Sequence, residues 1–266
     1  MADLNPISVW RKFLSTPNES RVKTLCVAFI VSAACALMVT AATVVLRPIQ
    51  AQNRAAEQEA RLEALIAAVP GMADLVGAAG GAALSTVVVD LRRGTAAAEI
   101  TPETLQAALS DPANWTEIAP GDDVAGIRSR PDFAQIYLLR EGERVSLAIL
   151  PIVGTGYNGR IQALLALNGD MQTLAGIAIT EQSETPGLGA RIEEPRWQQS
   201  FAGKQLFDAA GSARFAVARG QARTDHEVDG ITGATRTSNA ITQMVRFWVG
   251  PHGYGPLMAA IRRREF

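Results

Sequence analysis

The sequence predicts an α+β protein in which a single N-terminal transmembrane helix precedes one extracytoplasmic domain, built from a curved, mainly antiparallel sheet with packed helices. Three observations support this fold class. A long uncharged apolar stretch lies near the N-terminus. Short apolar runs separated by glycine-containing turns occupy residues 135–180, and two amphipathic segments lie near the C-terminus. These patterns predict an anchor, a set of hairpins and two covering helices, in that order.

The apolar stretch extends from Thr24 to Leu46, 23 residues without a charged side chain. At about 1.5 Å per residue, a helix of this length crosses a hydrocarbon core of about 30 Å. A secretory signal peptide has a shorter apolar core of about 7–15 residues, so we expect an uncleaved anchor. The preceding tail, residues 1–23, contains four basic residues, Arg11, Lys12, Arg21 and Lys23, whereas basic and acidic residues are interleaved after the span. The positive-inside rule then predicts a cytoplasmic N-terminus and, in a Gram-negative bacterium, a periplasmic C-terminal domain.

Residues 47–70 are rich in Ala, Glu, Gln and Arg and predict a juxtamembrane helix or linker that ends at Pro70-Gly71. Its apolar face packs either on the domain or on a partner protein, and the sequence does not choose between them. Residues 71–266 are expected to form the domain, with a flexible turn at 77–81. Strands are expected at residues 85–89, 135–139, 145–152, 160–167, 174–180 and 214–218, and helices after Thr101-Pro102, from Ser238 to Val249 and over 256–264.

Composition excludes some functions. Lys and Arg number 25 against 26 Asp and Glu, so the chain lacks the basic excess expected of a nucleic-acid-binding protein. Both cysteines, Cys26 and Cys35, lie within the apolar stretch on opposite helix faces, so they cannot pair with each other. Only two histidines occur, without close metal-ligand spacing, so no metal site is expected. Redox chemistry in the domain would therefore need an organic cofactor.

The segment from Asp229 to Ser238 is a hydroxyl-rich, glycine-containing turn that leads into a helix with one apolar face. A helix start offers unpaired N–H groups and a positive dipole end, which would stabilise a phosphate beside residues 232–237. Gly233 and Ala234 leave room for such a group. Alternatively, a threonine at this place, Thr235 or Thr237, simply caps the helix.

The run Asp-x-x-Thr-Gly-Ala-Thr resembles the signature on which bacterial flavin transferases act, joining FMN through its phosphate to the last threonine, here Thr235. The resemblance extends to Glu184-Thr185-Pro186-Gly187-Leu188-Gly189, to Glu194-Pro195-Arg196-Trp197 and to His252-Gly253-Tyr254-Gly255-Pro256. Together these motifs are similar to those of the NqrC family, which belongs to the sodium-translocating NADH:quinone oxidoreductase. The match is weak between about residues 71 and 152.

The resemblance implies FMN bound covalently, as a phosphoester of Thr235. It also implies that the cofactor contacts two groups of residues: Thr232, Gly233, Ala234, Thr237 and Ser238 around the acceptor, and Glu184, Thr185, Gly187, Leu188 and Gly189 as a second wall. Asp229 either belongs to the transferase recognition signal or caps the turn, and both interpretations stay open. No residue is an obvious catalytic acid or base. Members of the family that the motifs resemble typically carry histidine where this chain has Gln182, so no role of that histidine is assigned to this chain.

The implied function is that of an electron carrier in a bacterial inner-membrane complex that oxidises NADH, reduces quinone and transports sodium. Expected partners are an NADH-, FAD- and iron–sulfur-containing subunit, flavin- and quinone-binding membrane subunits, and a flavin transferase for maturation. Alternatives are the homologous flavin subunit of an Rnf-type ferredoxin:NAD oxidoreductase, a flavin-free membrane-anchored scaffold subunit and a free-standing periplasmic flavoprotein. The run Gly154-Thr155-Gly156-Tyr157-Asn158-Gly159 matches G-x-G-x-x-G, but a strand is expected after it where a dinucleotide site needs a helix, so we interpret it as a turn.

Overall fold

The structure is a computed structural model that describes residues 20–68 and 85–266. The chain divides into two compact units, residues 1–57 and 58–266. The expected helix end at Pro70-Gly71 and the expected turn at 77–81 lie outside the described residues.

Helix α2 runs without interruption from Arg21 to Ala68, and its residues up to position 57 belong to the N-terminal unit. Its segment Lys23–Ala41 has a mean hydropathy of 2.3 and is long enough to cross a membrane. Large apolar side chains such as Leu25 and Phe29 are exposed there, 71% and 75% respectively, as expected of a surface that faces lipid. The helix therefore fits a single-pass membrane protein. The sequence predicted separate membrane and juxtamembrane helices, but the backbone stays helical through position 48, although proline there cannot donate the helical hydrogen bond.

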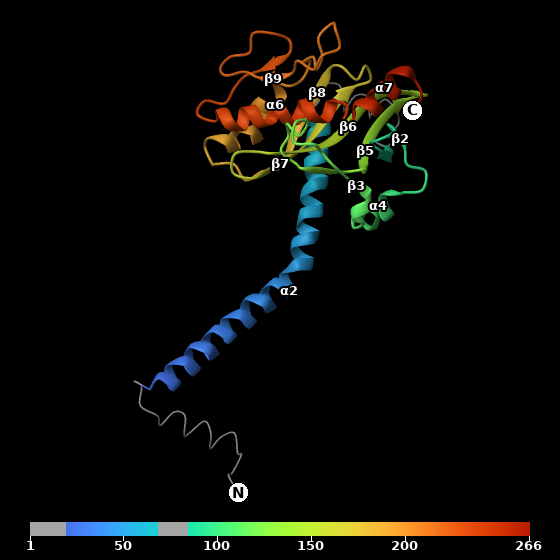
Figure 1. The fold of residues 1–266 in the computed structure, drawn as a ribbon. Coiled ribbons are helices and arrows are strands. Elements are labelled where there is room, and N and C mark those ends of the chain that lie inside the picture. Colours follow the sequence, from blue (N-terminus) through green and yellow to red (C-terminus); the bar gives the residue numbers. More distant parts are fainter. Residues whose placement is uncertain (1–19, 69–84) are drawn as a thin grey trace. The chain divides into compact units, whose positions relative to one another are not determined.

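The domain is built on one six-stranded antiparallel sheet with strand order β2-β1-β5-β6-β7-β8 (Figure 1). Its strands are β1 (Ser85–Asp90), β2 (Thr95–Ala96), β5 (Phe133–Glu141), β6 (Arg144–Thr155), β7 (Arg160–Asn168) and β8 (Leu174–Glu181). The expected strands over 85–180 and the antiparallel α+β class are thus confirmed. Register shifts interrupt the β5–β6 and β7–β8 pairings, and such bulges bend a sheet.

Shorter elements connect and flank this sheet. They are α4 (Pro102–Leu109), η1 (Pro112–Asn114), β3 (Trp115–Glu117) paired with β4 (Ser129–Pro131), η2 (Gly189–Glu193), α5 (Pro195–Gln199), and β9 (Ala216–Val217) paired with β10 (Glu227–Val228). The strand expected at 214–218 is only two residues long, and its pairing with β10 is parallel. A two-residue bridge leaves no alternating pattern to recognise.

Helices α6 (Thr235–Val249) and α7 (Gly255–Arg263) lie on one face of the sheet and enclose the main core (Figure 1). The apolar face of α6, including Ile241 and Val245, is fully buried. The helix is held to β6 at two points: the Trp248 indole N–H donates to the Val153 carbonyl at 2.6 Å, and Gly154 leaves space for Met244, whose side chain would lie 3.0 Å from an added Cβ. These contacts fix the C-terminal half of α6 relative to the end of β6.

The segment His252–Pro256 forms the joint between α6 and α7. A Cβ on Gly253 would lie 2.3 Å from the Trp248 carbonyl oxygen, and one on Gly255 would lie 2.5 Å from that of Gly250. Tyr254 is buried between them and donates to the Pro151 carbonyl at 2.7 Å. Burial raises the pKa of Tyr254, so its hydroxyl stays protonated and keeps this hydrogen bond. The motif is explained by packing alone.

Candidate functional site

A cleft of about 470 Å³ opens at the start of α6, within the range of about 300–1,000 Å³ that is usual for small-molecule sites. Three segments far apart in sequence form it: the β6–β7 turn, the loop after β8 and the turn that leads into α6. Its lining consists of Tyr157, Glu184, Thr185, Leu188, Gly189, Gly233, Ala234, Thr235, Arg236 and Thr237. Eight of these ten residues are among those expected from the sequence to contact a cofactor, so the two predicted walls do face one cleft.

Thr235 is the first residue of α6, and its side chain is exposed. The N-cap residue is Ala234, so neither threonine caps the helix. Gly233 makes this turn possible, because its φ of +80° lies in the left-handed region that favours glycine. Within the described part of the chain, the Thr235 hydroxyl forms no hydrogen bond. Ser238 N is the first amide of α6 to donate back along the helix, to the Ala234 carbonyl at 3.0 Å, so among the described residues the amides of 235–237 have no backbone acceptor.

Glu184 ties the three segments together from beneath the cleft. Its side chain is buried, only 4% exposed. One carboxylate oxygen accepts the Tyr157 and Asn158 amides at 2.8 and 3.0 Å, and the other accepts the Thr237 hydroxyl. Its own amide donates to the side-chain oxygen of Gln182. Gln182, which stands where histidine was expected, thus shapes the backbone of this loop.

The glycines of the G-x-G-x-x-G run make room for this carboxylate. A Cβ on Gly156 would lie 2.4 Å from Glu184 Oε1, and the Gly156 amide donates to the Gly159 carbonyl at 2.7 Å within the β6–β7 turn. On the opposite side, a Cβ on Gly189 would lie 2.7 Å from Glu184 Oε2. The run joins two antiparallel strands and opens no helix, in agreement with the interpretation as a turn.

Replacing Gly156 by alanine is expected to lower the free energy of unfolding by about 1–3 kcal/mol, because the added methyl group meets both Glu184 and the Ile161 side chain, 2.7 Å away. The matched control is Gly121→Ala, which meets no atom within 4 Å and is expected to change stability by less than about 0.5 kcal/mol. Thermal unfolding of both purified variants measures the difference. Equal midpoints would show that the turn adjusts without cost.

Two residues of the cleft were not singled out from the sequence, Tyr157 and Arg236. The Arg236 guanidinium lies 5.0 Å from the centre of the Tyr157 ring, a cation–π distance, and together they form one rim. Tyr157 is 56% exposed, and Leu188 on the opposite wall is 44% exposed. An exposed tyrosine and leucine facing one cleft are a surface suited to a planar ring. Arg236 follows Thr235 directly, which is the one signal that could have identified it.

Four expected site residues do not line the cleft. Thr232 is exposed beside it, and Gly187 sits in a turn with φ of +74° and open space around it. Ser238 is buried, and its hydroxyl accepts the Ile231 amide at 3.4 Å. Asp229 accepts the Ala222 amide at 2.7 Å, while its carbonyl accepts the Trp197 indole N–H at 2.9 Å. Both groups of Asp229 thus hold the loop that precedes the motif.

Comparison with known proteins agrees with this geometry. Residues 156–250 match the family model described as an FMN-binding domain, and this range contains every residue that lines the cleft. The chain is 34% identical over 258 residues to the NqrC protein of the Na(+)-translocating NADH-quinone reductase from Pseudomonas aeruginosa, covering 93% of this chain and 98% of that protein. It is also 34% identical to the corresponding protein of Yersinia pestis, with 92% and 94% covered.

Solved structures share the fold. The crystal structure of NqrC from Shewanella oneidensis superposes with a TM-score of 0.62 at 24% identity, covering 72% of this chain and 88% of that one. The structure of the corresponding protein from Parabacteroides distasonis gives a TM-score of 0.51 at 18% identity, with 81% and 96% covered. At these identities the structures establish the fold, whereas the sequence relatives establish the family. The chain belongs to the NqrC family of the Na⁺-translocating NADH-quinone reductase and carries its FMN-binding domain.

Proposed function

We propose that this chain is the covalent-FMN electron carrier of a sodium-translocating NADH:quinone oxidoreductase in a bacterial inner membrane. The observation that carries the proposal is the hydroxyl of Thr235, which is exposed and, among the described residues, free of hydrogen bonds at the start of α6 inside the cleft. A threonine that only stabilised the helix would direct this oxygen to a backbone amide. Here it is available for a phosphoester bond.

The residues around Thr235 fit FMN. The free amides at the start of α6 and the positive end of the helix dipole would stabilise the phosphodiester charge, and the Arg236 guanidinium adds a cation at the same rim. Gly233 and Ala234 would lie beside the phosphate, whereas Thr185, Leu188 and Gly189 would form the wall against the ring. Thr232 and Ser238 lie outside the lining, so we assign them to the shape of the turn.

The side chains of the cleft position a cofactor and supply no obvious proton transfer. The Glu184 carboxylate is occupied by three donors of the protein itself, and the Thr237 hydroxyl is one of them. When bound, FMN supplies the electron-transfer chemistry, and the protein sets its position and surroundings. NADH oxidation, quinone reduction and sodium transport then belong to the other subunits of the complex, and attachment of FMN to a separate flavin transferase.

Intact mass of the protein purified from its native membrane tests the proposal, together with peptide mapping of residues 224–236. The expected result is an increment equal to FMN less one water, localised to Thr235. An unmodified peptide from an active native preparation would contradict it and favour the scaffold role. Co-purification with multi-span membrane subunits would separate the role within the complex from that of a free-standing flavoprotein.

The proposed topology places residues 1–23 in the cytoplasm, 24–46 in the membrane, 47–70 at its surface and 71–266 in the periplasm. The apolar segment of α2 and the basic residues before it support this orientation. Protease added to spheroplasts is expected to digest the domain, while the same protease added to inside-out vesicles is expected to leave it intact. The reverse pattern would invert the assignment.

A further inference from the structure

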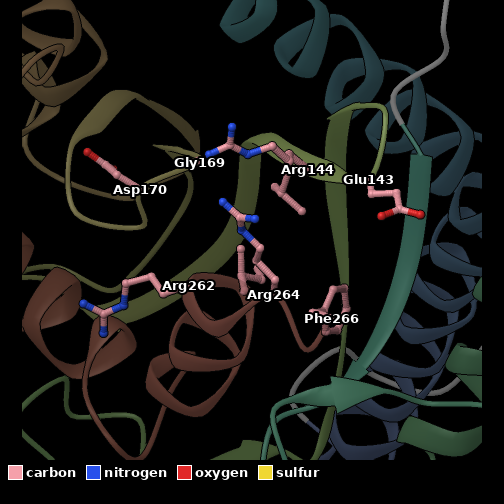
Figure 2. Close-up of a pocket in the computed structure, with 9 residues that line it drawn as sticks. Glu143, Arg144, Gly169, Asp170, Arg262, Arg264 and Phe266 are labelled. Carbon is pink, nitrogen blue, oxygen red and sulfur yellow. The ribbon is translucent and has the colours of Figure 1, made fainter.

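A second recess, of about 190 Å³, lies where the start of β6, the β7–β8 turn and the end of α7 meet (Figure 2). Three arginines contribute to it: Arg144 from β6, and Arg262 and Arg264 from the end of α7. Glu143 and Asp170 are its two acidic side chains. The recess is large enough for a small oxyanion with part of its hydration shell.

The arginines converge without a carboxylate between them. The Arg264 guanidinium points toward that of Arg144, which extends over Gly169 (Figure 2). Among the described residues, none of the three forms a salt bridge, whereas the neighbouring Arg263 pairs with Glu265 at 2.7 Å. Two guanidinium groups that face each other repel, so the arrangement favours an anion between them.

The acidic residues of the rim do not fill this role. Asp170 accepts the Gln172 and Thr173 amides, each at 2.8 Å, and the Thr173 hydroxyl at 2.6 Å, so its oxygens are engaged in its own turn. The Glu143 carboxylate extends away from the three arginines (Figure 2). Neither carboxylate lies between Arg144 and Arg264.

Stabilisation of a helix end explains only part of the cluster. Arginines in the last turn of a helix interact favourably with its dipole, which accounts for basic residues at the end of α7. Arg144 comes from a strand and so is not part of the helix end, yet its charge adds to those of Arg262 and Arg264 in the same recess. Arg262 also lies over the Phe207 ring, 5.9 Å from its centre, which holds it at the rim. A role shared by both elements is needed, and anion binding supplies one.

We propose that this recess binds a phosphate group, with Arg144 and Arg264 as its two principal ligands and Arg262 as a flanking charge. Guanidinium groups match phosphate because their planar forks donate two parallel hydrogen bonds to it. The group could come from free phosphate or from the headgroup of an anionic phospholipid, and the chemistry of recognition is the same. The site is independent of the flavin and of its proposed attachment.

Two probes test the site on the full-length protein: calorimetric titration of inorganic phosphate in detergent, and hydrogen exchange of residues 255–266 in nanodiscs with and without phosphatidylglycerol. The test variant is Arg144→Gln combined with Arg264→Gln, and the matched control is Arg263→Gln, whose charge is paired elsewhere. All positions are exposed, so the variants are expected to fold, which circular dichroism checks.

The expected result is binding that weakens at least tenfold in the double variant and is unchanged in the control. Binding of phosphate in detergent would identify the free ion, whereas protection by phosphatidylglycerol alone would identify the lipid headgroup. Absence of both effects, or equal binding by the double variant, would overturn the proposal. A glutamate-rich peptide that binds where both phosphate probes fail would also overturn it, in favour of a protein partner.

Discussion

Replacing Thr235 by alanine is expected to remove all covalent flavin and to abolish quinone reduction by the assembled complex, while the domain stays folded. The first effect follows because the hydroxyl oxygen is the proposed attachment atom. The second follows because no other threonine of the cleft is exposed with an unbonded hydroxyl at a helix start: Thr237 is buried and bonded to Glu184. Stability is expected to change by less than about 0.5 kcal/mol, since the exposed Thr235 hydroxyl has no hydrogen bond to lose among the described residues.

Flavin fluorescence on a denaturing gel, NADH:quinone activity of membranes and thermal unfolding measure these three effects. The matched control is Thr224→Ala, because Thr224 is an exposed threonine on the same mapped peptide but outside the motif. It is expected to retain flavin and activity. If flavin fluorescence persisted in the Thr235→Ala variant, the assignment of Thr235 as the acceptor would be wrong.

Replacing Glu184 by alanine is expected to lower the free energy of unfolding by about 3 kcal/mol. The change leaves two part-buried backbone amides and the buried Thr237 hydroxyl without their acceptor, and loss of the acceptor of a buried donor costs about 1–3 kcal/mol. For a domain of this size, the thermal midpoint should fall by about 6–12 °C. The cleft should also lose its shape, because the β6–β7 turn is no longer tied to α6.

Glu184→Gln is the matched variant, because glutamine has the same size and keeps one oxygen that can accept both amides. The Thr237 hydroxyl can rotate to accept from the new amide group, so we expect a loss of only about 1 kcal/mol. A Glu184→Ala variant as stable as Glu184→Gln would show that the carboxylate does not hold these segments together. Flavin content of both variants would report on the cleft separately from the stability of the domain.

The long strands and the terminal helices could be predicted because each has a regular apolar pattern. The sequences of β5 to β8 are bounded by glycine-containing turns, and α6 has a clear apolar face, although it begins at Thr235, three residues before the expected start at Ser238. The elements that were missed, such as β2, β3, β4 and β10, contain two or three residues and depend on partners distant in sequence. Such bridges are fixed by tertiary packing, which periodicity does not encode.

Most residues that line the candidate site could be predicted from the sequence, but the hydrogen bonds that join its segments could not. The motif around Thr235 and the loop at 184–189 were expected to form two walls, and both line the cleft. The hydrogen bond between Glu184 and Thr237 could not be predicted from the sequence, because it joins residues 53 positions apart. The position of Tyr157 could not be predicted for the same reason. It lies at the rim because the β6–β7 turn contacts α6 in the folded domain.

The length of β6 separates the two recesses of the domain. Its last residues, Val153 and Gly154, hold α6 beside the flavin cleft, while its first residue, Arg144, belongs to the arginine recess. A strand of 12 residues spans roughly 35–40 Å. Two ligands bound at these ends are too far apart to touch. Salt also screens the electrostatic interaction between them, because the Debye length at physiological salt is about 8 Å. The proposed phosphate site and the proposed flavin site can therefore be occupied independently of each other.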